Sequence, residues 1–349
     1  MSIQLAPALA LALLPVCLDP GPREGPGDEL RFAPEQGLRL TKTLRRSSEE
    51  SLDSSVAYFN DEEQDAETDS SSSSEGLIVL TDEYGASEDG RLLRLARSFD
   101  EVEYENLHSS EFGGEVHDFE VTGTSELTGS TIVFEWDEDD EEYSVRDEDE
   151  ELDDELLEDL RIELDFAELL PDGGEVSEGD EWTIEAEVFA QLMTPEDGIP
   201  IDWNSDGWDD DEGDVVIEES DEGDMEESES HEGEVSAEYR GTREVDGVLV
   251  GVIALEGELT TDYASERDLD SNHATGSFSY EMTRTRFVEG ECLWNLEGGH
   301  LHSLFIELDT ESVSAQESTF DFDGQEFSHA VESEESGAVT FEVTFEEAE

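Results

Sequence analysis

Apolar and polar residues alternate with a period of two along much of this chain. In a β-strand this pattern places the apolar side chains on one face of a sheet and the polar side chains on the other. Nine stretches show it: 38–44, 77–84, 115–121, 131–136, 182–188, 248–259, 277–287, 301–308 and 339–345. Hairpin turn signals lie between them, at Asp89-Gly90, Asp246-Gly247, Glu289-Gly290, Glu297-Gly298-Gly299 and Asp323-Gly324.

Several of these stretches are longer than the usual strand of about five or six residues. Residues 248–260 form one such stretch, and it is followed by another at 277–287. Long hairpins with a single apolar face are more typical of a large curved sheet or half-barrel than of a compact sandwich. The sequence therefore predicts a mainly β fold, with a large curved antiparallel sheet or half-barrel and one short helix packed on it.

That helix is predicted at residues 150–160. Leu152, Leu156, Leu157 and Leu160 form an apolar stripe at helical spacing, and the acidic residues at its start suit the positive end of a helix dipole. We expect the leucines to pack on the sheet. A short turn at 166–170 is expected to end at Pro171, because proline cannot continue a helix.

The chain carries 101 Asp and Glu against 16 Lys and Arg, a formal net charge of -85, and Lys42 is its only lysine. Nucleic acid is excluded as a partner, because phosphate binding needs clustered basic residues and the one local group is Lys42, Arg45 and Arg46. Anionic membrane surfaces are excluded on the same ground. Self-repulsion of this size predicts saline surroundings, bound divalent cations or unfolded segments. A GC-rich genome would also produce a lysine-poor composition.

Three acidic segments hold almost no apolar residues, and we predict disordered loops at 61–75, 137–149 and 206–234. None is long enough to separate independent domains. Residues 28–349 are therefore predicted to form a single antiparallel β domain, with two lobes that meet near the helix as the alternative.

The first seventeen residues are predicted to be a signal peptide, because the apolar run at 3–16 has the length of a signal core and is too short to span a bilayer as a helix. No Lys or Arg precedes the run, and a buried N-terminal helix is the alternative. Cys17 stands where a lipid-attachment cysteine would, before a Pro/Gly tether at 18–27; ordinary cleavage near Cys17 or Ala12 is the other interpretation. We expect export to the periplasm, cell envelope or extracellular space, without a transmembrane helix in the mature chain.

Some segments resemble a known group of proteins. These are residues 30–37, 89–100, 165–171, 176–182 and 239–247. Together they resemble exported or lipid-anchored β-proteins of marine, planctomycete-type bacteria that carry a domain of unknown function. The resemblance covers most of the mature chain, but it lies in turns and strand starts. It implies an exported β architecture and no catalytic residue.

A candidate calcium loop begins at Asp202. Asp202, Asn204 and Asp206 occupy positions one, three and five, and Gly207 permits the sharp turn that lets oxygen ligands converge on the ion. Position twelve is Gly213, where a bidentate Glu is typical, so later residues would have to complete the shell. The predicted metal set is Asp202, Asn204, Asp206, Trp208, Asp210 and Glu212. A solvated acidic loop is the alternative.

No catalytic constellation is evident. The chain has no Gly-x-Ser-x-Gly elbow and no phosphate-binding loop that ends in Lys, and bulky neighbours predict that Cys292 is buried. His300 and His302 would share a strand face, but no third metal ligand lies beside them.

Two hypotheses follow. The first is a non-catalytic exported β-protein of the bacterial cell envelope that binds an apolar ligand or a protein partner. The second is a calcium-responsive acidic surface or structural protein. An enzyme is the third and weakest hypothesis.

Overall fold

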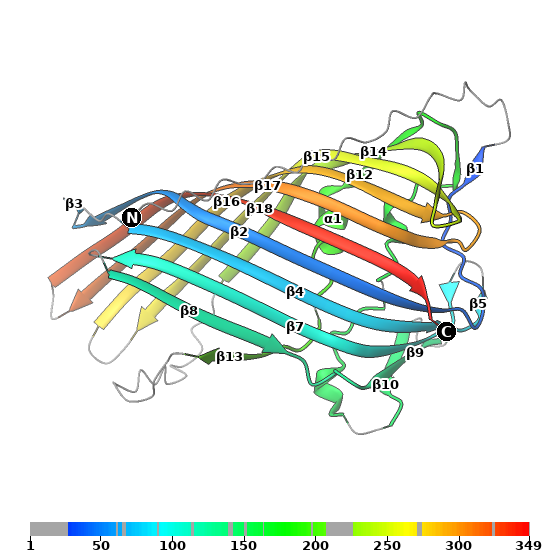
Figure 1. The fold of residues 1–349 in the computed structure, drawn as a ribbon. Coiled ribbons are helices and arrows are strands. Elements are labelled where there is room, and N and C mark those ends of the chain that lie inside the picture. The colour runs from blue at the N-terminus through cyan, green and yellow to red at the C-terminus, as the bar shows by residue number, and fades with distance from the viewer. Residues whose placement is uncertain are drawn as a thin grey trace, which may run out of the picture.

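The computed structural model describes residues 27–60, 62–64, 68–88, 91–112, 115–138, 142–149, 152–162, 164–196, 198–206, 226–270, 274–322 and 325–348. Most of this part is β, and one antiparallel sheet contains fourteen strands (Figure 1). The main path runs through β10 (Glu142–Asp147), β9 (Thr131–Asp137), β7 (Arg94–Phe112), β4 (Thr68–Tyr84), β2 (Arg39–Phe59), β18 (Gln325–Glu347), β17 (His300–Phe322), β16 (Ala274–Asn295), β15 (Val248–Asp270), β14 (Glu226–Val245) and β12 (Glu181–Glu185).

Shorter strands complete the architecture. In the large sheet, β8 (Glu115–Thr124) pairs with β7, β13 (Asp202–Asp206) pairs with β8, and β3 (Glu62–Gln64) pairs with β2. Two separate ladders join β1 (Asp28–Glu29) to β11 (Glu175–Val176) and β5 (Ser87–Glu88) to β6 (Arg91–Leu92). Among the described strands the main path ends at β10 and β12 without closing. The predicted large curved antiparallel sheet with one short helix is confirmed.

The position of the helix was predicted wrongly. The α-helix of the described residues is α1 (Ala186–Leu192), whereas the described part of the predicted helix, 152–160, contains only a 3-10 turn, η1 (Asp154–Leu156). The alternating stretch at 182–188 is a strand only as far as Glu185. Ala186, Phe189 and Met193 are buried, and this helical spacing places them on one face of α1 and its C-cap. The predicted turn before Pro171 is confirmed as η2 (Ala167–Leu169).

The other alternating stretches overlap strands of the sheet, and the turn at Asp246-Gly247 is confirmed. Both of its residues have a positive φ, 52° and 87°, as a two-residue hairpin turn requires. The predicted turn at Glu289-Gly290 is wrong, because both residues lie inside β16. Gly290 is needed there for close packing, since a Cβ at this position would stand 2.8 Å from the carbonyl oxygen of Phe305 on β17.

The predicted acidic loops are partly strands. β4 takes up residues from Thr68 onward, β10 lies within 137–149, and β14 begins at Glu226. Each of these strands pairs with a neighbour, β4 with β7, β10 with β9 and β14 with β15, so its backbone groups are hydrogen-bonded in a ladder even where the side chains are polar. We predicted disorder from composition, which shows that the side chains are polar but does not show whether another strand pairs with the segment. Residues 207–225 lie outside the described part.

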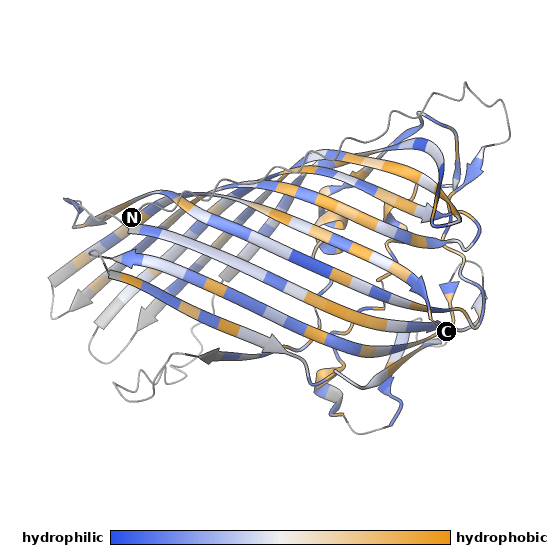
Figure 2. Cartoon of the chain, in the orientation of Figure 1, coloured by the Kyte–Doolittle hydropathy of each residue, from blue (hydrophilic) through white to orange (hydrophobic). Residues whose placement is uncertain are grey.

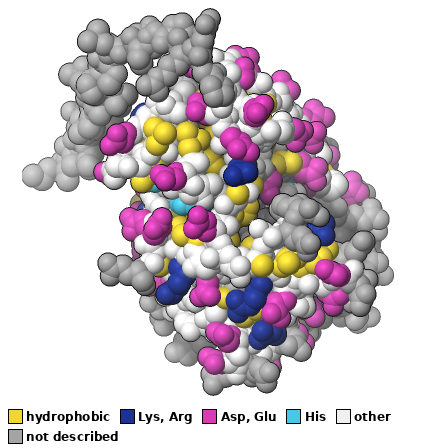
Figure 3. All heavy atoms as spheres, turned by 90° about the vertical axis from the view of Figure 1, so that its right-hand side faces the viewer, with side chains coloured by type: hydrophobic (Ala, Val, Ile, Leu, Met, Phe, Trp, Pro, Cys, Tyr) yellow, Lys and Arg dark blue, Asp and Glu magenta, His cyan; other side chains and the backbone are white. Residues whose placement is uncertain are grey.

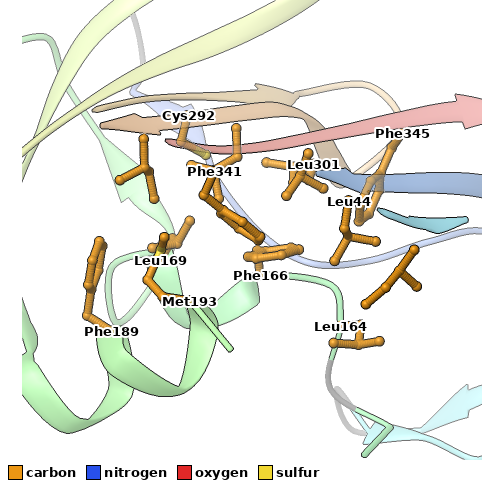
Figure 4. Packing of buried hydrophobic residues seen from close by; sticks show 14 of the residues in the cluster. Leu44, Leu164, Phe166, Leu169, Phe189, Met193, Cys292, Leu301, Phe341 and Phe345 are labelled. Atoms are coloured by element: carbon orange, nitrogen blue, oxygen red, sulfur yellow. The ribbon is translucent and has the colours of Figure 1, made fainter. Parts of the chain in front are cut away.

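One end of the sheet's inner face is filled by the chain's own segment 152–201. Its buried residues, which include Leu157, Leu160, Phe166 and Phe189, belong to the same apolar cluster as the inner faces of β2 and β14 to β18. Phe166 lies with its ring centroid 6.1 Å from Phe341 and 6.4 Å from Phe345 (Figure 4). The leucines of the predicted helix therefore do pack on the sheet, from a turn instead of a helix.

The two faces of the long strands differ in chemistry. On β2, Leu40, Lys42 and Leu44 are buried inward, while Arg45 is exposed. The outer face is acidic on β15 and β17, where the exposed residues include Glu256, Glu258, Asp262, Glu307, Asp309 and Glu311. Figure 2 shows hydrophobic and hydrophilic residues alternating along the strands, and Figure 3 shows acidic side chains spread over one end of the molecule. In the described residues, we find no helix with the length and apolar character that a membrane crossing needs.

Candidate functional site

A buried charge cluster fixes segment 152–201 to the sheet. Asp82 on β4 is fully buried and contacts two cations: Lys42 Nζ lies 2.7 Å from its Oδ2, and Arg97 Nε lies 2.8 Å from its Oδ1. Arg97 also donates to the carbonyl oxygens of Arg161 and Ile162, and Lys42 donates to that of Leu164 at 2.7 Å. The charged donors of the cluster therefore hold segment 152–201 by three of its backbone carbonyl groups, those of Arg161, Ile162 and Leu164. Its role is structural, since these groups are occupied by one another.

The ionisation of this cluster follows its surroundings. Burial alone would raise the pKa of Asp82, but Arg97 and Lys42 hold that pKa below its ordinary value. Asp165, which accepts a hydrogen bond from the Ala167 N–H at 3.0 Å, is different. Burial raises the pKa of Asp165 to about 6, against the opposite effect of nearby Lys42. Asp165 is thus the carboxyl group of the cluster that changes charge near neutral pH.

A cavity of about 420 Å³ lies on the inner face beyond the filled end. α1 and its C-terminal residues contribute Phe189, Ala190 and Met193, and the sheet contributes apolar Leu259, Leu308 and Val339. The volume is within the range of about 300–1,000 Å³ that is typical of small-molecule sites. A larger hollow of about 1270 Å³ adjoins it, since Glu50 and Thr310 line both.

Three arginines also line this cavity: Arg46 on β2 and Arg284 and Arg286 on β16. Arg46 Nη1 lies 2.8 Å from Glu196 Oε1, and Arg284 Nη2 lies 3.5 Å from Glu50 Oε1. Arg286 differs, because its Nη1 donates to the hydroxyl of Thr261 at 3.0 Å and no ion pair of Arg286 is found among the described residues. Burial and the two neighbouring arginines lower the pKa of Arg286. The cavity thus combines six apolar residues with ten polar ones, among them the three arginines and the carboxylates Glu50 and Glu229.

The predicted calcium residues lie elsewhere. Asp202, Asn204 and Asp206 belong to β13, which pairs with β8, and Asp202 and Asn204 are exposed. In a strand, alternate residues are about 7 Å apart, so these positions do not converge as they would in a tight loop. Trp208, Asp210 and Glu212 lie outside the described residues, and within the described part no group of three His, Cys, Asp or Glu could hold a metal. The calcium site stays a prediction.

The sequence predicted the environment of one cysteine correctly but did not reveal the arginines of the cavity. Cys17 lies outside the described residues, while Cys292 is buried as predicted, and burial raises the pKa of its thiol.

The sequence analysis missed Arg284 and Arg286 and noted Arg46 only as part of a basic group. A signal was present: on β16 the alternation continues from buried Val288 to Arg286 and Arg284, which places both arginines in the inward register.

Comparisons with known proteins add little. No protein-family model matches the chain, and no protein of curated function matches it. Among solved structures, Pseudomonas aeruginosa OccK7 (OpdD) aligns over 88% of this chain and 99% of its own, with 9% identity and a TM-score of 0.18. The β domain of the Bordetella autotransporter Brka aligns over 88% of this chain and 99% of its own, with 8% identity and a TM-score of 0.16. At such scores these likenesses carry no argument about function.

Proposed function

We propose that this chain is a non-catalytic, exported β-protein of the bacterial cell envelope that binds an apolar ligand in the cavity of its inner face. The observation that carries the proposal is the cavity itself, with Phe189 and Met193 on one side and Leu259, Leu308 and Val339 on the other. Six of the sixteen residues that line the cavity are apolar, and concave sites that combine apolar surface with polar groups are typical of small-molecule binding.

The arrangement of the inner face supports a ligand of limited size. Much of the apolar surface near Leu44, Phe341 and Phe345 is already covered by segment 152–201. The apolar residues of the 420 Å³ cavity lie at the boundary between this filled end and the larger hollow. A ligand would lie there with its apolar part against α1. The signal-like segment at 1–17 and the resemblance to exported or lipid-anchored β-proteins support the proposed location.

Filling the cavity should abolish binding of a neutral apolar probe. Ala190 is half-buried on α1 and lines the cavity, so Ala190→Trp would occupy part of its volume. We expect the affinity for N-phenyl-1-naphthylamine, measured by fluorescence titration, to fall by about tenfold or more, equivalent to about 1.4 kcal/mol.

Glu187→Trp is the matched control for this experiment, because Glu187 is exposed on the same helix and does not line the cavity. It should leave probe affinity unchanged. Equal affinities for the wild type and both variants would contradict the proposed site, as would a wild type that takes up no probe.

A further inference from the structure

The cavity's arginines carry an inference that rests on the proposed function and extends it. The chain as a whole has about six acidic residues for every basic one, since Asp and Glu number 101 and Lys and Arg number 16. Around this cavity, Arg46, Arg284 and Arg286 lie together on the inner face of a sheet whose outer face is acidic. Glu50 and Glu229 also line this cavity, but burying a cation costs free energy unless that cation is itself paired and hydrogen-bonded.

Three carboxylates lie at or beside the cavity; two of them are paired with arginines, and the charges of Glu229 and Glu50 also favour the charged form of Arg286. Glu196 is paired with Arg46 and Glu50 with Arg284, while Glu229 Oε1 lies 3.6 Å from His231 Nε2. His231 Nδ1 in turn lies 3.1 Å from the Thr261 hydroxyl that accepts the hydrogen bond from Arg286. Of the three arginines, Arg286 is therefore the one whose hydrogen bond in the described structure goes to a neutral hydroxyl.

Two further donors at the same place lack partners. The Nε atoms of Arg46 and Arg284 are buried and find no hydrogen-bond acceptor in the described structure. A buried donor without an acceptor destabilises the folded protein. An oxyanion is suited to such a group, because guanidinium donors bind carboxylate or sulfate oxygens through short, charge-assisted hydrogen bonds.

The apolar and cationic parts of the cavity are adjacent. Arg286 is paired across the sheet with Thr310 on β17 and Leu259 on β15, and Leu308 and Val288 lie one inward position further toward the filled end. We infer that the ligand is an anionic amphiphile, whose single oxyanion head binds Arg286 beside Arg46 and Arg284 and whose apolar tail lies against Leu259, Leu308 and α1.

Isothermal titration with three ten-carbon probes tests this inference: decanoate and decyl sulfate below their critical micelle concentrations, and neutral decanol below its solubility limit. We expect both anions to bind the wild type about tenfold more tightly than decanol, which corresponds to about 1.4 kcal/mol. Arg286→Gln should remove most of this preference and leave decanol affinity within about twofold. Arg45→Gln is the matched control, because Arg45 is exposed on the outward face of β2 beside Arg46.

The outcomes separate the two proposals. One outcome is that decanol binds, that Ala190→Trp prevents its binding, and that the anions bind no more tightly than decanol. This result would overturn the inference of an anionic head group and leave the proposed apolar site standing. If no probe binds, both proposals fail. If Arg286→Gln and Arg45→Gln weaken anion binding equally, the effect comes from overall charge and the assignment to Arg286 is overturned. The comparison of head groups uses the unchanged protein, so it remains decisive even if Arg286→Gln does not fold.

Discussion

Replacing Asp82 by asparagine should lower the free energy of unfolding by about 3–5 kcal/mol, the usual cost of removing one partner from a buried ion pair. The change keeps the shape of the side chain but removes the charge that both Lys42 and Arg97 contact. Lys42 and Arg97 would then remain buried without the carboxylate that both contact. Equilibrium unfolding in urea, monitored by tryptophan fluorescence, measures the loss.

Glu83→Gln is the control for this prediction, because Glu83 is adjacent in sequence, exposed and on the opposite face of β4. It should change the free energy of unfolding by no more than about 0.5 kcal/mol. A similarly small effect of Asp82→Asn would show that the buried cluster does not hold segment 152–201 to the sheet.

Replacing Asp165 by asparagine should have the opposite effect at alkaline pH. Burial raises the pKa of Asp165 to about 6, above its ordinary value of 3.8, so the folded protein binds this proton more tightly than the unfolded chain does. The resulting stability is fully present below about pH 4 and is lost as the pH rises through about 6. The asparagine side chain of the variant would be neutral at every pH, so Asp165→Asn should be more stable than the wild type by about 3 kcal/mol at pH 8.

The measurement for this second prediction is the difference in unfolding free energy between wild type and variant at pH 4 and pH 8. The other carboxylates are common to both proteins and largely cancel in this difference. The difference should grow with pH for Asp165→Asn and stay flat for Asp172→Asn, whose position is exposed in a turn. A flat difference for Asp165→Asn would mean that this carboxyl group is not held as the structure describes.

Much of the sheet could be predicted from the alternation of residues, because one buried face imposes a period of two on every strand. Leu40, Lys42 and Leu44 show both the strength and the limit of this signal. The pattern places all three inward, but it does not reveal that Lys42 meets Asp82 and Arg97 there. Those partners come from separate strands, and only the strand order brings them together.

The alternation of residues could not predict the position of the helix or the presence of the cavity, and the reasons differ. The short apolar run from Trp182 fits either a strand or a helix, and the structure contains a strand followed at once by α1. The cavity joins Arg46 to Arg284 and Arg286, which are more than 230 residues away in the chain. Local patterns can show that each arginine faces inward, but the register between β2, β18, β17 and β16 decides that they share one cavity.

The central claim is that the inner-face cavity takes up an apolar ligand, and photo-crosslinking tests it most directly. The probe is a neutral ten-carbon alcohol that carries a diazirine on its chain, and the attachment points are mapped by peptide mass spectrometry. We predict saturable labelling of α1 around Phe189 and Ala190 and of Leu259 and Leu308, which decanol competes away. Labelling confined to exposed outer-face residues such as Phe305 and Val313, or labelling that decanol does not reduce, would contradict the account.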